Sequence, residues 1–129
     1  MAESKQNMQT KYGYSPDIWE KAKTEMREIL SEYAKSRATI FYSELVSKIK
    51  TIRHEPDSYA LAHMLGEISE AENAKGRGML SALVVQKDGG MPGRGFFEFA
   101  QELGYPVKDK TEFWIDQVNT VCAYWENQK

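Results

Sequence analysis

The sequence predicts an α+β domain that is mainly helical, with an N-terminal helix, a small sheet and a C-terminal helix. Two observations lead to this fold class. Apolar residues recur at three- and four-residue spacing in several segments, as on the buried face of a helix. Only the segments 39–42 and 79–85 have the β-branched, aromatic or continuously apolar character of strands. With 129 residues, 41% of them hydrophobic, the chain can form one core without a staple.

Composition excludes several classes of protein. Cys122 is the only cysteine, which excludes an intrachain disulfide and a multi-cysteine zinc site and favours a reducing, cytoplasmic location. No apolar run approaches the roughly 20 residues that span a bilayer, and residues 1–14 lack the apolar stretch of a signal peptide, so we expect no membrane partner. The formal net charge of −2 leaves only a local basic patch for nucleic-acid contact.

The N-terminal helix begins at Ser15 and Pro16, a helix cap followed by a proline at the first helical position. It ends near Ser36. Residues 1–14, without periodicity, are predicted to be a flexible N-terminal arm, and 15–129 a single domain. The buried face of the helix consists of Trp19, Ala22, Met26, Ile29, Leu30 and Tyr33.

Two further helices follow the first strand, 39–42. Ser43 is the expected cap of a short second helix, and 50–56 is a loop. Asp57 or Ser58 caps the third helix, which Gly76 and Gly78 end. The buried positions expected on the third helix are Leu61, Met64, Leu65, Ile68 and Ala71.

The second strand, 79–85, is nearly continuously apolar and is predicted to be the central strand of the sheet. A glycine-rich loop, 88–95, separates it from a short helix that starts at Phe96 and stops at Gly104. The last helix begins at a capping box formed by Asp109 and Glu112. Its expected buried stripe is Trp114, Val118, Val121, Cys122 and Trp125.

This order of elements is that of a winged-helix domain, in which the second and third helices form a helix-turn-helix and a hairpin makes the wing. The second arm of that hairpin would come from residues 90–95, which are poor strand formers. An open loop in place of a hairpin therefore remains an alternative.

Three stretches, Ala38 to Leu45, Leu61 to Gly66 and Met79 to Phe97, resemble a pattern that recurs in small uncharacterised bacterial proteins. More distantly, they resemble the winged-helix half of DNA alkyltransferases and alkyltransferase-like proteins. That family has a strand with Pro-Cys-His-Arg-Val, where residues 80–85 here read Leu-Ser-Ala-Leu-Val-Val. Its DNA-contacting Arg also has no counterpart in residues 58–74. The resemblance therefore implies the fold, and does not imply alkyl transfer.

The strongest local excess of positive charge lies in residues 75–95, around the glycine-rich loop. Glycines let backbone N–H groups converge on an anion, and the following helix would add the partial charge of its N-terminus. The string lacks the ending of a phosphate-binding P-loop, so a purely structural turn is the alternative. The candidate anion- or nucleic-acid-binding residues are Lys75, Arg77, Lys87, Gly89, Gly90, Gly93, Arg94 and Gly95.

A second basic cluster, Lys48, Lys50 and Arg53, lies between the second and third helices, where a helix-turn-helix approaches the DNA backbone. The third helix opposes this reading because it carries glutamates and no Lys or Arg. An ordinary solvated surface is the alternative.

No constellation for catalysis can be assembled. His63 and Glu67 are a helical pair, but two ligands do not make a metal site. Ser81 lacks the glycine-flanked turn that exposes a nucleophile, and Cys122 belongs to a buried stripe. We therefore expect no enzyme activity, no cofactor and no metal.

The sequence thus predicts a non-enzymatic binding module that contacts a nucleic-acid backbone through the loop 86–95 and the turn 48–54. The alternative is a protein-interaction or homodimerisation module that does not bind DNA. Several tyrosines would supply its exposed aromatic surface, namely Tyr12, Tyr14, Tyr59, Tyr105 and Tyr124.

Overall fold

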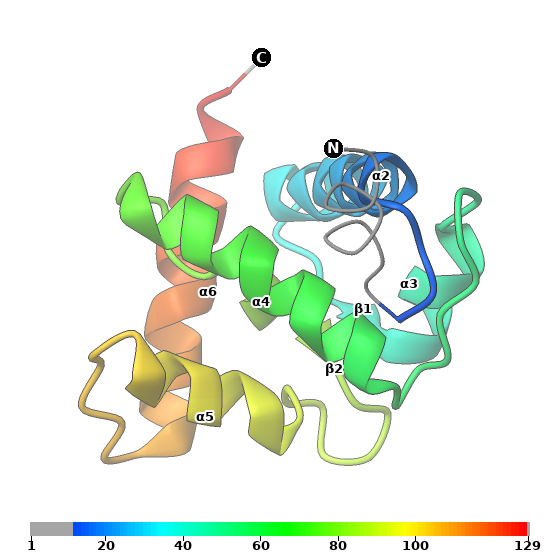
Figure 1. Cartoon of the computed structure of the whole chain (residues 1–129). Coiled ribbons are helices and arrows are strands. Elements are labelled where there is room, and N and C mark those ends of the chain that lie inside the picture. Colours follow the sequence, from blue (N-terminus) through cyan, green and yellow to red (C-terminus); the bar gives the residue numbers. More distant parts are fainter. Residues whose placement is uncertain (1–11, 129) are drawn as a thin grey trace.

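The computed structural model describes residues 12–128 and confirms the mainly helical α+β class (Figure 1). Its elements are, in order, α2 (Pro16–Lys35), β1 (Ile40–Phe41), α3 (Tyr42–Lys48), α4 (Tyr59–Ala74), the 3₁₀ helix η1 (Leu80–Leu83), β2 (Val84–Val85), α5 (Arg94–Glu102) and α6 (Lys110–Glu126). Helices α2, α4 and α6 surround η1, and α5 covers the lower side of the molecule in this view (Figure 1).

Three helices begin at the caps that the sequence predicts. The side chains of Ser15, Ser58 and Asp109 each accept a hydrogen bond from the backbone N–H three residues further on, at 3.3, 3.1 and 3.0 Å. Such a bond satisfies one of the free N–H groups of a first helical turn. The stop at Gly104 is also confirmed, since this residue has a φ of +102°.

The sheet consists of β1 and β2, which pair in parallel with Ile40 opposite Val84 and Phe41 opposite Val85. Every residue from Met79 to Val85 is buried, as expected. The prediction that this whole segment is a strand is wrong, because Leu80–Leu83 forms the 3₁₀ helix η1.

One residue of α4, Ser69, explains why η1 replaces a strand. The Ser81 N–H donates to the Ser69 hydroxyl at 2.9 Å, and the Ser69 hydroxyl donates to that of Ser81 at 2.6 Å. A side chain of α4 thus satisfies a backbone group that a longer ladder would otherwise have paired. A continuously apolar run shows burial, but it does not distinguish a strand from a short helix.

Two helix starts differ from the prediction. Helix α3 begins at Tyr42, because the Glu44 carboxylate accepts the N–H of Phe41, the capping residue, at 3.2 Å; Ser43 lies inside the helix. Helix α5 begins at Arg94, two residues before Phe96. Arg94 and its neighbour at position 95 are therefore helical and do not belong to the loop.

The buried face of α4 also differs at its C-terminal end. Ala71 is exposed, whereas Glu72 is only 1% exposed. The Glu72 Oε2 atom lies 3.1 Å from Arg27 Nε and 3.5 Å from Arg77 Nη1. A buried carboxylate needs such partners; here they are Arg27, 45 residues away in the sequence, and Arg77, just beyond the end of α4.

The core has two adjoining parts. The larger one joins α2, α4, η1 and α6, and it contains Trp19, Met26, Met64 and the buried thiol of Cys122. The smaller one packs α5 under Met79 and Ala82. Its other buried residues are Phe96, Phe97 and Ala100.

Of the predicted N-terminal arm, only residues 12–14 lie in the described part of the chain. Tyr12 stacks on Trp19 with ring centroids 5.8 Å apart, and Tyr14 packs against the larger core. Residues 1–11 lie outside the described residues, as does Lys129.

Candidate functional site

A cavity of about 420 Å³ opens beside the N-terminal ends of α3, α4 and α5. The parallel pairing of β1 and β2 explains in part why these helix ends lie close together. Both strands point the same way, so α3 and the glycine-rich loop leave the sheet at the same edge. Rings and aliphatic side chains form much of the wall, namely Phe41, Tyr42, Leu61, Leu65, Phe96 and Phe99.

Polar groups from four segments line the same cavity. They are Ser43, Asp57, Ser58, Ser81, Gln86 and Lys87. Ser81 is engaged by Ser69, and Ser58 caps α4. Asp57, Gln86 and Lys87 are exposed, and no hydrogen bond or ion pair between described residues engages their side chains. These three side chains are therefore available to a ligand.

The glycine-rich loop is closed by a hydrogen bond from the Gln86 N–H to the Met91 carbonyl at 2.8 Å. Gly89 and Gly90 have φ values of +81° and +66°, a conformation that side chains disfavour. No strand forms between residues 86 and 93, so the described chain has no hairpin wing and the open-loop alternative remains.

Tyr42 ties this loop to α3. Its hydroxyl oxygen accepts the Gly93 N–H at 3.0 Å. Burial raises the pKa of the Tyr42 phenol, and the bond from Gly93 opposes that shift. The phenol is therefore neutral at physiological pH and keeps its own hydrogen as a donor.

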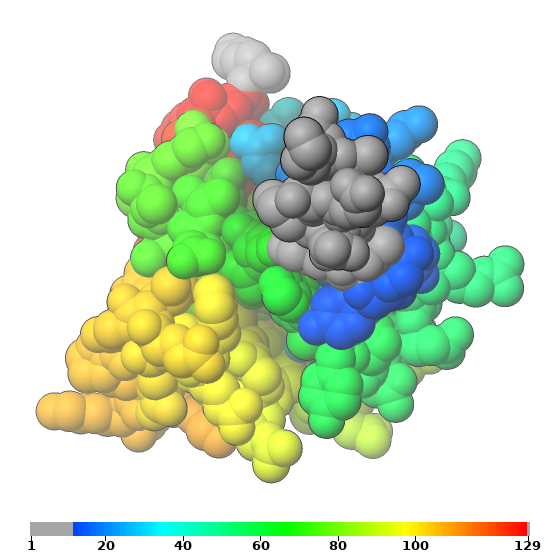
Figure 2. Space-filling model, viewed as in Figure 1, coloured from blue at the N-terminus to red at the C-terminus, as the bar shows by residue number. Residues whose placement is uncertain are grey.

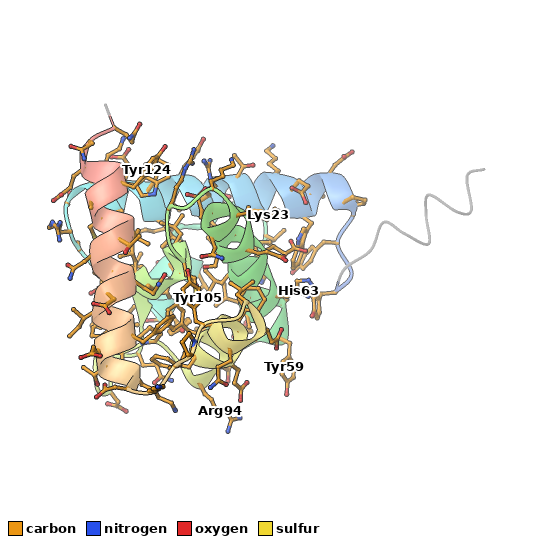
Figure 3. All side chains as sticks on the ribbon, turned by 90° about the vertical axis from the view of Figure 1, so that its left-hand side faces the viewer. Lys23, Tyr59, His63, Arg94, Tyr105 and Tyr124 are labelled. Carbon is orange, nitrogen blue, oxygen red and sulfur yellow. The ribbon has the colours of Figure 1, made fainter. Side chains whose placement is uncertain are left out.

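Part of the predicted basic site is brought together here. Lys87, Gly93 and Gly95 line the cavity, and Arg94 is 84% exposed between the last two, with Glu98 at 3.4 Å. In Figure 3 Arg94 projects outward from the start of α5. Gly89 and Gly90 are exposed in the adjoining turn and do not line the cavity.

Lys75 and Arg77 lie elsewhere, beyond the other end of α4. A helix of 16 residues is about 24 Å long, so the predicted cluster 75–95 is split in two. Arg77 is engaged by Glu72 and lies 4.5 Å from the centroid of the Tyr124 ring. The sequence grouped these two cations with Lys87 and Arg94 in one site. The structure corrects this grouping, because it separates the two pairs by the length of α4.

The second basic cluster follows the C-terminal end of α3. Lys48, Lys50 and Arg53 are all exposed. The Glu25 carboxylate of α2 accepts the Lys50 N–H at 2.9 Å and so holds the turn against α2. Because α3 is about 10 Å long, Lys48 lies roughly that distance from the start of α3, which borders the cavity, and the chain beyond Arg53 returns to the cavity at Pro56.

A second hollow of about 440 Å³ adjoins the cavity between α4 and α5 and shares Ala62, Gly66, Gly95 and Phe99 with it. Figure 2 shows the surface dipping between the green of α4 and the yellow of α5. Four carboxylates line this acidic groove, those of Glu67, Glu70, Glu98 and Glu102. The groove is therefore acidic, whereas the first cavity has one carboxylate, Asp57, and one cation, Lys87, among its described lining residues.

The two histidines have different surroundings. His63 Nε2 lies 3.2 Å from Glu67, which also accepts hydrogen bonds from Trp19 and Lys23, and His63 and Lys23 are labelled in Figure 3. His54 is 4% exposed and packs edge-on against Trp19, and burial lowers its pKa.

Within residues 12–128 no group of three His, Cys, Asp or Glu side chains is placed to hold a metal ion. No helix in the same range is both long and apolar enough to cross a membrane.

The cavity walls were not predicted from the sequence. The available signal was Gly66, because a glycine inside a helical pattern is unfavourable for the helix. A Cβ atom at Gly66 would make an ordinary van der Waals contact with the ring of Phe99 at 3.7 Å, so close packing does not account for this glycine.

Searches against protein-family models, curated proteins and solved structures gave no match to this chain.

Proposed function

We propose that the chain is a non-enzymatic, winged-helix-like binding module of the cytoplasm that contacts the phosphate backbone of a nucleic acid at the cavity end of α4. One observation carries the proposal. Lys87 and Arg94 are exposed beside the start of α5, whose capping residue Gly93 offers no side-chain acceptor to the first N–H groups. Cations and open N–H groups together favour phosphate.

The two cations at this end, Lys87 and Arg94, can exchange their present contacts for a phosphate. Among the described residues no carboxylate pairs with Lys87, which lies 5.8 Å from the centroid of the Phe41 ring. Arg94 has only the exposed contact with Glu98, a kind of pair that contributes less than about 1 kcal/mol. A phosphate can therefore replace Glu98 as the partner of Arg94 at little cost.

The acidic groove restricts the path that a bound strand can take across the surface. Glu70, Glu98 and Glu102 repel phosphates from the side between α4 and α5. A strand held at Lys87 is favoured to continue toward the turn with Lys48 and Lys50, where further cations are exposed. Contacts of this kind carry no base specificity.

Fluorescence anisotropy with labelled single-stranded and duplex oligonucleotides at several salt concentrations tests the proposal. We expect binding that weakens with salt, and at least fivefold weaker binding for the double variant Lys87→Glu, Arg94→Glu. Loss of two phosphate contacts should lower the slope of log K against log salt by about 1.4 to 1.8.

Lys75→Glu is the matched control, because Lys75 is an exposed cation beyond the far end of α4. It changes the net charge like each of the other reversals and should leave affinity within twofold. No binding at low salt, or an equal loss for Lys75→Glu as for each single reversal at the cavity end, would show that this end does not contact nucleic acid.

A protein-interaction or homodimerisation module is the second candidate, and one observation favours it. Tyr59 is 86% exposed at the start of α4, close to the acidic groove that it also lines. An exposed aromatic side chain beside a hollow is typical of protein interfaces. Analytical ultracentrifugation of the chain and of Tyr59→Ser tests homodimerisation, which predicts a dimer that the substitution weakens.

A further inference from the structure

The walls of the cavity are suited to a flat apolar body. Its volume of about 420 Å³ falls within the range of roughly 300–1,000 Å³ that is typical of small-molecule sites. Three rings line it from two different elements: Phe41 at the end of β1, and Phe96 and Phe99 on α5. An aromatic ligand would stack on or pack against such rings and bury apolar surface on both sides.

The polar side chains that can contact a ligand are few and chemically distinct. Lys87 is the one cation among the described residues that line the cavity, and the open N–H groups at the start of α5 add partial positive charge beside it. Asp57 and Gln86 offer oxygen acceptors for amino groups, and Tyr42 offers a hydroxyl donor. The cavity thus combines a place for an anion with acceptors for an amine.

We propose that this cavity binds a small molecule with a flat aromatic body, an amino group and an anionic group, of the size and chemistry of a nucleoside monophosphate. The inference goes beyond the proposed function, because the ligand is a single unit and backbone contact by itself requires no cavity. Two sources share this chemistry, a free nucleotide and the terminal nucleotide of a strand.

Isothermal titration calorimetry on the full chain with adenosine 5′-monophosphate is the primary test. Adenosine and inorganic phosphate are the two partial ligands. We expect the monophosphate to bind at least fivefold more tightly than either, because only the whole molecule uses both the rings and Lys87. In Lys87→Gln its affinity should fall to about that of adenosine.

Gly95→Leu places a bulky side chain at the cavity without straining the protein. A Cβ atom at Gly95 would meet no other atom within 4 Å, and leucine is a better helix former than glycine. Gln101→Leu is the matched control, since it adds the same side chain at an exposed position of α5 that lines neither hollow. We expect at least tenfold weaker monophosphate binding for Gly95→Leu and no change for Gln101→Leu.

A labelled oligonucleotide with a 5′-phosphate separates the two sources. Competition by the free monophosphate for this strand, with loss of both in Gly95→Leu, would support the cavity as the site of a terminal nucleotide. Monophosphate binding without strand binding would support a free nucleotide and would overturn the proposed function alone.

Two results would overturn the inference. One is a strand that binds while the monophosphate at millimolar concentration neither binds nor competes, a result that leaves backbone binding intact. The other is monophosphate binding that Gly95→Leu and Lys87→Gln leave unchanged, which would place the ligand outside this cavity.

Discussion

The two ends of α4 differ in how their charges are used. At the C-terminal end Glu72 is buried, and its carboxylate pairs with Arg27 and Arg77. At the N-terminal end the cavity keeps Lys87 and Asp57 exposed, with no hydrogen-bond or ion-pair partner for either side chain among the described residues. The paired charges around Glu72, at this closed end, stabilise the fold, whereas Lys87 and Asp57, at the open end, are available to a ligand.

The difference shows why charge counted along the sequence is a poor guide to a site. Arg77 and Lys87 are ten residues apart and have the same charge, yet Arg77 completes a buried ion pair and lies 4.5 Å from the Tyr124 ring centroid. Only burial and partners separate a structural cation from an available one.

The largest effect is expected from Glu72→Gln at the closed end. Removing one partner of a buried ion pair leaves Arg27 and Arg77 unpaired. Because these side chains are 37% and 22% exposed, water offsets part of the loss, and we expect a destabilisation of about 2 kcal/mol. Urea unfolding measures it. Glu70→Gln, at an exposed position of the same helix, should change stability by less than about 0.5 kcal/mol; equal effects would contradict the distinction.

A smaller effect is expected from Ser58→Ala at the open end. This change removes the cap of α4, which accepts the Leu61 N–H at 3.1 Å, and should cost about 1 kcal/mol. Thermal unfolding followed by circular dichroism measures the loss. Ser58→Asp keeps an acceptor at the cap and should retain most of the stability; if both variants lose the same amount, capping is not the function of Ser58.

A smaller effect still, and of opposite sign, is expected from Gly95→Ala. The helical backbone and the open space around a Cβ atom at Gly95 allow alanine without a clash, so stability should rise by about 0.5 kcal/mol. Chemical denaturation measures the gain. Gly90→Ala is the contrast, because its φ of +66° makes alanine unfavourable. A loss of stability in Gly95→Ala would mean that the start of α5 is more tightly packed.

The effect that is smallest at neutral pH concerns His54. Its pKa is lowered by burial, so the unfolded chain binds a proton more readily than the folded one. The stability contribution of the neutral imidazole is present above the unfolded pKa of about 6.5 and is lost as the pH falls below it. Unfolding at pH 7.5 and 5.0 should show a greater acid loss in the wild type than in His54→Phe. An identical loss in both would assign the acid sensitivity to other groups.

Local signals predicted the helices well and the buried polar contacts poorly. Ser15, Ser58 and Asp109 cap helices because a side-chain acceptor three residues before a free N–H is a local arrangement, readable in the sequence. The pairing of Glu72 with Arg27 joins residues 45 apart, and the periodicity of α4 gives no sign of it. The same periodicity predicted that Ala71 is buried, whereas it is exposed.

The candidate site was predicted in part. The loop glycines and Lys87 carried a local signal of composition and charge. The cavity depends on where α3, α4 and α5 begin relative to one another, which is set by the β1–β2 pairing and by Tyr42 reaching Gly93 across 51 residues. Its walls, Phe41 and Phe99 among them, read as ordinary core residues in the sequence.

The most direct measurement is a titration of the ¹⁵N-labelled chain with a short single-stranded oligonucleotide, followed by amide chemical shifts. We expect saturable shifts at Lys87, Gly93 and Gly95 at the open end, and none at Lys75 or Arg77 at the closed end. Shifts centred on the closed end, or none anywhere at low salt, would contradict the claim that the open end of α4 is the binding end of the molecule.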